Sequence, residues 1–105
     1  MATRMIEITK KPSELSTSNL GKIFKSAIPT VPDFVLPDLL IYSIGSYEKV
    51  GFKKIVCKQT GYSMIVWENY DIEIESSVHP IKKIPMLSII NCLLEIGAVE
   101  FTLKH

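Results

Sequence analysis

The chain has few of the residues from which catalytic and metal centres are commonly built. Neither of its two histidines, His79 and His105, has a cysteine or carboxylate nearby at metal-ligand spacing. Cys57 could meet His79 as a nucleophile–base pair across space. However, Cys57 shares its expected strand face with Ile55, and buried cysteines are usually inert. The five glycines are scattered, so there is no glycine-rich phosphate loop. We therefore expect no catalytic residues, metal site or cofactor, and a protein that is not an enzyme.

The chain also lacks a strong charge of either sign and a long hydrophobic run. Lysine and arginine number 12 against 11 acidic residues, so the net charge of +1 gives no general attraction to nucleic acid or membrane. The first eight residues lack the apolar core of a signal peptide. The most apolar segment, residues 84–99, is too short to span a bilayer. With two cysteines and no disulfide framework, these features favour a cytoplasmic protein that does not contact the membrane.

What the sequence does contain is a strong pattern of β-strands. Two runs rich in β-branched and aromatic residues, 52–58 and 62–67, flank a short break at Gln59-Thr60-Gly61, which is typical of a hairpin. A third run, 70–75, alternates strictly between apolar and acidic residues after a turn at Glu68-Asn69. Further strands are expected at 5–9, 39–44 and 98–104.

Two helices complete the expected fold. The first follows Ser16 and ends before Pro29, because its apolar residues fall three and four apart: Leu20, Ile23, Phe24 and Ala27. The second runs from Pro85 to Ile96, with Gly97 just beyond its end. Its polar residues form one narrow stripe: Ser88, Asn91 and Glu95. A helix this apolar is expected to be nearly engulfed by the sheet or by a second subunit.

Together these elements predict one α+β domain over residues 1–105. We expect a predominantly antiparallel sheet of five or six strands with two helices packed on it, in the order β-α-β-β-β-β-α-β. Residues 1–4 are expected to be flexible, and residues 76–83 are expected to form a loop. The proline-rich segment 29–38 is expected to be extended and held against the body by its apolar residues: Val31, Phe34, Val35 and Leu36.

The sharpest functional feature is an acidic row, which we define as Asp71, Glu73 and Glu75. On a strand these carboxylates lie on the face opposite Ile72 and Ile74. Lysines of the neighbouring strand could neutralise the row by cross-strand pairing, which would make it an ordinary solvated face. Alternatively, the row and its neighbouring aromatic residues form a binding surface. The residues of that surface are Trp67, Glu68, Tyr70, Asp71, Glu73 and Glu75.

A second charged set offers a different function. Lysines interleaved with aromatic residues are typical of single-stranded nucleic-acid binders. This set comprises Tyr47, Lys49, Phe52, Lys53, Lys54 and Lys58. Arginine, the best cation for stacking on bases, occurs only at Arg4.

We therefore expect a small intracellular protein that binds another protein, in the manner of an inhibitor or a toxin-neutralising immunity protein. Its acidic, aromatic-flanked surface would occlude a basic partner, such as a toxin or nuclease. Two alternatives stay open: a single-stranded nucleic-acid binder that uses the lysine–aromatic set, and a structural homo-oligomer that assembles through the second helix.

Overall fold

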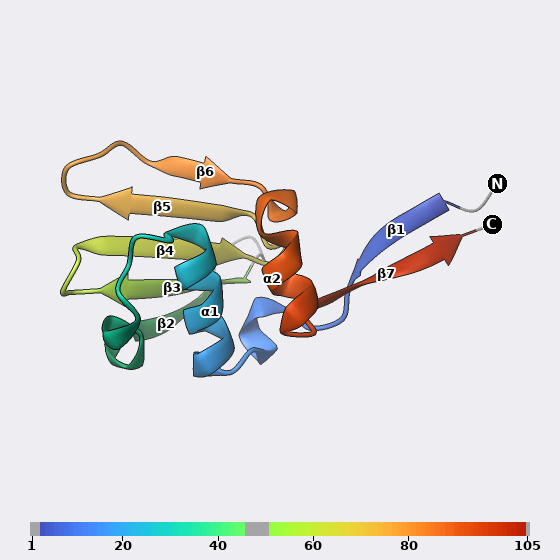
Figure 1. Ribbon diagram of the computed structural model, residues 1–105, viewed down its shortest axis with the longest axis horizontal. Helices are drawn as coiled ribbons and strands as arrows, with labels where there is room; N and C mark the ends of the chain where they lie inside the picture. The colour runs from blue at the N-terminus through green and yellow to red at the C-terminus, as the bar shows by residue number, and fades with distance from the viewer. Residues whose placement is uncertain (1–2, 46–50, 105) are drawn as a thin grey trace.

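The protein is an α+β domain built on an antiparallel sheet whose five strands follow one another in sequence order (Figure 1). The computed structural model describes residues 3–45 and 51–104. Each strand pairs with the next one along the chain. The strands are β2 (Leu40–Gly45), β3 (Gly51–Cys57), β4 (Tyr62–Trp67), β5 (Ile72–Ser76) and β6 (Lys82–Ile84). The expected fold class is confirmed, although the short strand β6 lies where the sequence predicted only a loop.

The first helix, α1 (Thr17–Ala27), begins and ends as its sequence predicts. The Ser16 side chain accepts a hydrogen bond at 3.1 Å from the backbone N–H of Asn19, which satisfies one of the free donors of the first turn. Leu20, Ile23 and Phe24 are buried against the sheet. The apolar spacing therefore identified the buried face of this helix correctly.

The second helical segment is shorter and more exposed than its sequence suggested. It starts as a 3₁₀ turn, η3 (Met86–Ile89), and continues as α2 (Ile90–Glu95). Gly97 follows with φ of 74°, a left-handed conformation that glycine adopts without steric cost. Leu93 is fully buried, but Leu87 is 66% exposed. The sheet therefore does not engulf this segment, which covers only one end of the sheet (Figure 1); burial by a second subunit stays a prediction.

The two faces of the five-stranded sheet have different environments. Both helices lie on one face, the inner face, where they enclose the core (Figure 1). The strands contribute to this core through alternate residues, among them Ile55, Met64, Val66, Ile72 and Ile74. The opposite side chains form the outer face, which is turned away from the helices. Its residues Phe52, Lys54, Val56, Ile65, Trp67 and Glu73 are half-buried.

The two terminal strands form a separate two-stranded ribbon. β1 (Thr3–Ile8) pairs with β7 (Val99–Lys104) in an antiparallel register that places Ile6 opposite Phe101. Figure 1 shows this ribbon extending away from the helices, with both chain ends at its tip. Thr3 and Arg4, for which a flexible start was predicted, belong to β1; residues 1 and 2 lie outside the described part.

The proline-rich segment 29–38 is less extended than predicted. Its second half forms a 3₁₀ helix, η2 (Asp33–Asp38). Val31, which precedes η2, and Val35 within it are both buried as expected. Phe34 falls on the opposite side of that helix and is 76% exposed.

Leu93→Ala should destabilise the protein by roughly 2–5 kcal/mol, because it removes a fully buried side chain and leaves a cavity. Glu95→Ala, on the exposed side of α2, should change the free energy of unfolding by about 0.5 kcal/mol or less. Urea denaturation of the two variants measures both effects. Equal losses of stability would show that the buried face of α2 is assigned incorrectly.

Candidate functional site

The candidate site is organised by the tight turn that joins β4 to β5. The backbone N–H of Tyr70 donates to the Trp67 carbonyl at 2.9 Å, and the N–H of Trp67 donates to the Asp71 carbonyl at 3.0 Å. Tyr70 has φ of 66°, a left-handed conformation that is rare for a bulky residue and is usually filled by glycine in such turns. The turn predicted at Glu68-Asn69 is therefore confirmed.

Tyr70 itself is part of the core and not of the surface. Its side chain is fully buried, and its hydroxyl donates a hydrogen bond to the Lys10 carbonyl. The expectation that Tyr70 contacts a partner is therefore wrong. The sequence already indicated that Tyr70 is buried, because alternation along the strand places it on the same side as Ile72 and Ile74.

Asp71 is held in place by two neighbours. One carboxylate oxygen accepts a hydrogen bond from the Asn69 side-chain amide at 3.0 Å, and the other accepts from the backbone N–H of Met86 at 3.1 Å. The Asn69 side-chain oxygen in turn accepts from the Asp71 backbone N–H at 3.0 Å. Asp71 precedes β5 and joins the turn to the start of η3, so it differs in role from the other carboxylates of the acidic row.

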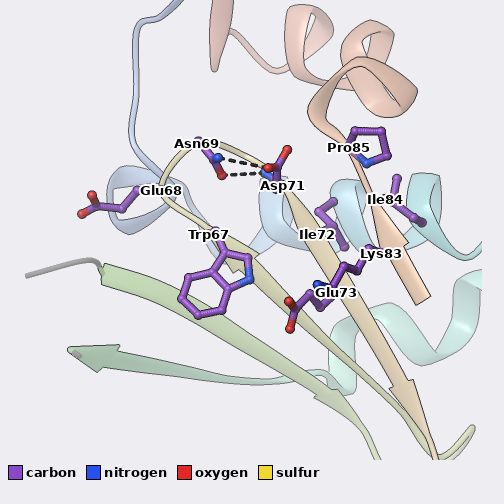
Figure 2. A pocket seen from close by; sticks show the side chains of 9 residues that line it. All are labelled: Trp67, Glu68, Asn69, Asp71, Ile72, Glu73, Lys83, Ile84 and Pro85. Carbon is purple, nitrogen blue, oxygen red and sulfur yellow. Dashed lines mark hydrogen bonds between the residues drawn. The ribbon is translucent and has the colours of Figure 1, made fainter. Parts of the chain in front are cut away.

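A groove with a volume of about 550 Å³ lies beside this turn (Figure 2). We call it the Trp67 groove; it lies between the β4–β5 turn and the end of β6. Its lining comprises Trp67, Glu68, Asn69, Asp71, Ile72, Glu73, Lys83, Ile84 and Pro85. Three of these side chains are carboxylates and one is a lysine, so the groove is acidic. Figure 2 shows the Glu73 carboxylate on the side of the Trp67 indole, whereas Glu68 extends away from both.

Glu73 and Glu75 occupy the outer face of the sheet, as the acidic row predicted. Glu73 lies opposite Ile65 of β4 and Lys83 of β6, and both glutamates are half-buried. Lys54 lies opposite Ile65 from the other side, so one strand separates it from Glu73. Among the described residues, no ion pair joins Glu73 to Lys54 or Lys83. Lys83 is nevertheless the direct cross-strand neighbour of Glu73, and Figure 2 draws the two side chains next to each other.

Trp67 also contacts a second aromatic residue on the outer face. It lies opposite Phe52 of β3, and the two ring centroids are 4.8 Å apart with the rings tilted by 50°. Such tilted aromatic pairs are favourable and fix the orientation of both rings. The pair therefore places an ordered indole at the edge of the Trp67 groove.

The second charged set does not come together on one surface. Phe52 and Lys54 lie on the outer face, whereas Lys53 alternates to the inner side of β3 and Lys58 follows the end of that strand. The remaining members, Tyr47 and Lys49, lie outside the described residues. Lys83 of the groove was not assigned to the acidic surface, because its strand was expected to be part of a loop.

The described residues contain no group of three or more histidine, cysteine, aspartate and glutamate side chains arranged to hold a metal ion. None of the helices in this part of the chain is long and apolar enough to cross a membrane. Compared with known protein families, curated proteins and solved structures, the chain matches none of them.

Tyr70→Phe should make stability less sensitive to alkaline pH. Burial, and secondly the carboxylate of Glu14, raises the pKa of the Tyr70 hydroxyl. The unfolded chain ionises this group near its ordinary pKa of about 10, whereas the folded protein keeps the proton, so unfolding becomes more favourable as the pH rises above about 10. Urea denaturation at about pH 9 and about pH 11 should show a smaller loss of stability in the variant than in the native protein.

At neutral pH the same variant lacks the hydrogen bond to the Lys10 carbonyl. Its free energy of unfolding should therefore be lower by about 0.5–1.5 kcal/mol. If the free energy of unfolding fell equally in the two proteins at alkaline pH, the assignment of Tyr70 as a buried, protonated hydroxyl would be contradicted.

Proposed function

We propose that this chain is a protein-binding protein of the inhibitor or immunity kind, which binds a basic segment of a partner in the Trp67 groove. The observation that carries the proposal is the position of an ordered indole beside the Glu73 carboxylate, in an acidic groove next to the outer face of the sheet (Figure 2). Tryptophan is also enriched among the residues that contribute most binding energy in protein interfaces.

The chemistry of the groove suits a cationic side chain. The face of an indole attracts a cation, and a nearby carboxylate adds a charge-assisted hydrogen bond. Arginine satisfies both contacts best, because its planar guanidinium can stack on an aromatic ring while its N–H groups reach a carboxylate. Trp67 and Glu73 would supply these two contacts. Asp71 is held by Asn69 and Met86, so its charge would act on the partner without direct pairing.

The outer face of the sheet would provide the rest of the contact area. A stable interface buries about 800 Å² on each partner, which is more than a single groove offers. Phe52 and Ile65 supply half-buried apolar surface next to Trp67, and Val56 continues it along β3. Glu75 extends the acidic charge along β5. The mechanism would be occlusion: a basic substrate-binding surface of the partner, such as that of a nuclease or another toxin, is covered. We place this activity in the cytoplasm as part of the same proposal.

Single-stranded nucleic acid is the second candidate ligand. The observation in its favour is that the tilted aromatic pair Phe52–Trp67 lies on the same face as Lys54. The acidic charge of Glu73 and Glu75 on that face opposes phosphate binding, so we rank this candidate below a protein partner.

The proposal is tested by capturing the partner and measuring its affinity for variants of the groove. The tagged protein is used to isolate partners from the native host, and a single dominant protein is expected. Trp67→Ala should weaken binding to that protein at least about tenfold, because a buried aromatic contact at an interface centre is lost. Glu73→Lys should slow association, and its effect should decrease as salt is raised.

The matched control is Glu95→Lys, which makes the same charge change on the exposed side of α2, away from the groove. It should leave the affinity unchanged, and circular dichroism should show that all variants are folded. Unchanged affinity in folded Trp67→Ala and Glu73→Lys would overturn the proposal. Co-purification of RNA, with binding that weakens as salt rises, would favour the second candidate instead.

A further inference from the structure

The inner face of the sheet carries a second cavity, at the place where α1 ends. The register sets Tyr62 of β4 opposite Ser76 of β5, and residues directly opposite each other in an antiparallel pair share a face. It also sets Ile74 of β5 opposite Lys82 of β6. Ile74 belongs to the core, so Lys82 and, by alternation along β5, Ser76 also lie on the inner face. α1 ends at Ala27, and Figure 1 shows β4, β5 and β6 extending past the helices.

This cavity, which we call the Lys82 pocket, has a volume of about 280 Å³. It is bounded by residues 27–30 at the end of α1, by Tyr62, Ile74 and Ser76 on the sheet, and by the loop and strand residues His79 and Lys82. Lys82 and Lys83 are consecutive in β6, so their side chains point to opposite faces of the sheet. The Lys82 pocket therefore shares no residue with the Trp67 groove, which contains Lys83.

The two sides of the Lys82 pocket differ in polarity. Its floor and the wall at the end of α1 are apolar, and they include Ile28 and Ile74, each only 7% exposed. The opposite side carries His79 and Lys82, which are both exposed to solvent. Among the described residues that line the pocket, none is acidic, and Lys82 forms no ion pair within the described part of the chain. The pocket is therefore amphipathic, with an unneutralised positive charge on one side.

Ser76 organises the polar side. Its hydroxyl oxygen accepts hydrogen bonds from the backbone N–H of Val78 at 3.3 Å and of His79 at 3.0 Å. These bonds order the start of the loop that leads to β6. Because the Ser76 oxygen accepts in both bonds, its own O–H remains to donate to a ligand. A histidine ring carries an N–H in either neutral tautomer, so Ser76, His79 and Lys82 all offer donors.

We propose that the Lys82 pocket binds a small monocarboxylate with an apolar body. The carboxylate would accept hydrogen bonds from the Lys82 ammonium and its neighbouring donors, and the apolar body would lie against Ile28 and Ile74. An apolar cavity with a few polar groups that fix orientation is the usual construction of a small-molecule site. Such sites for drug-sized ligands have volumes of about 300–1,000 Å³, so a cavity of about 280 Å³ suits a smaller molecule.

The charges around the pocket favour a single negative charge. The carbonyl end of α1 carries a partial negative charge, which opposes an anion at Ala27 and Ile28. The carboxylate therefore belongs on the opposite side, with Lys82. Among the described residues that line the pocket, Lys82 is the one lysine or arginine. A phosphate ester carries about −1.5 to −2 charges at neutral pH, which one lysine does not balance.

An NMR titration of the isotope-labelled native protein with benzoate and with hexanoate tests the proposal. Either acid should shift the backbone N–H signals of Ile28, Ser76, His79 and Lys82, with a Kd of about 1 mM, as expected for ligands of so few atoms. The uncharged counterparts benzamide and hexanamide have nearly the same size and shape. They should bind at least about tenfold more weakly, because the charge-assisted hydrogen bond to Lys82 is lost.

Two variants test the role of the lysine. Lys82→Gln removes the charge but keeps a polar side chain, so it should weaken binding of the acid at least about tenfold and bring its affinity close to that of the uncharged counterpart. Lys22→Gln is the matched control, because Lys22 is exposed on α1 and does not line the pocket. It should bind like the native protein, and the spectra of both variants show whether they are folded.

The proposal would be overturned if neither acid bound to the native protein, or if the shifts lay only at residues away from the pocket. Equal affinity for each acid and its uncharged counterpart would also overturn it, as would an equal loss of affinity in Lys22→Gln and Lys82→Gln. Tighter binding of phenyl phosphate than of benzoate would overturn the choice of a monocarboxylate.

Discussion

The contact that joins the Trp67 groove to the base of the ribbon is the burial of Tyr70 in a left-handed turn, with its hydroxyl bonded to the Lys10 carbonyl. A bulky residue in this conformation is strained, and it persists only where its surroundings hold it. Here the core holds the ring and Lys10 holds the hydroxyl. The Lys10 backbone N–H also donates to the Ala98 carbonyl at 3.2 Å, at the base of the ribbon. One buried side chain therefore connects the β4–β5 turn to the base of the ribbon, where β1 has ended and β7 begins.

This arrangement fixes the shape of the Trp67 groove within the fold. The closed turn fixes where β4 ends and β5 begins, so that Trp67 and Glu73 lie on the outer face while Ile72 enters the core. Asp71 then joins the same turn to the N–H of Met86. Binding sites that are already formed lose less conformational entropy when a partner binds. The groove accordingly combines a fixed aromatic ring with a carboxylate that forms no ion pair with Lys54 or Lys83.

Most of the fold could be predicted from the sequence, because apolar spacing reports directly which residues face the core. It identified the buried residues of α1, the burial of Leu93 and the outward direction of Glu73. It could not distinguish the ribbon from a strand of the main sheet, since alternation at Val99, Phe101 and Leu103 defines a face but not the sheet to which a strand belongs. The roles of Tyr70 and Asp71 depend on contacts with Lys10 and Met86, which are distant in sequence. Such pairings follow from the tertiary structure and carry no local signal.

The central claim is that the Trp67 groove selects a cationic side chain, and fluorescence can test it directly because Trp67 is the only tryptophan in the chain. The most direct measurement is a titration with a short arginine-containing peptide and with its citrulline counterpart, which has nearly the same shape but no charge. The account predicts that the arginine peptide changes the Trp67 emission, that added salt weakens the effect, and that Glu73→Gln abolishes it. An equal response to both peptides, or none to either, would contradict the account.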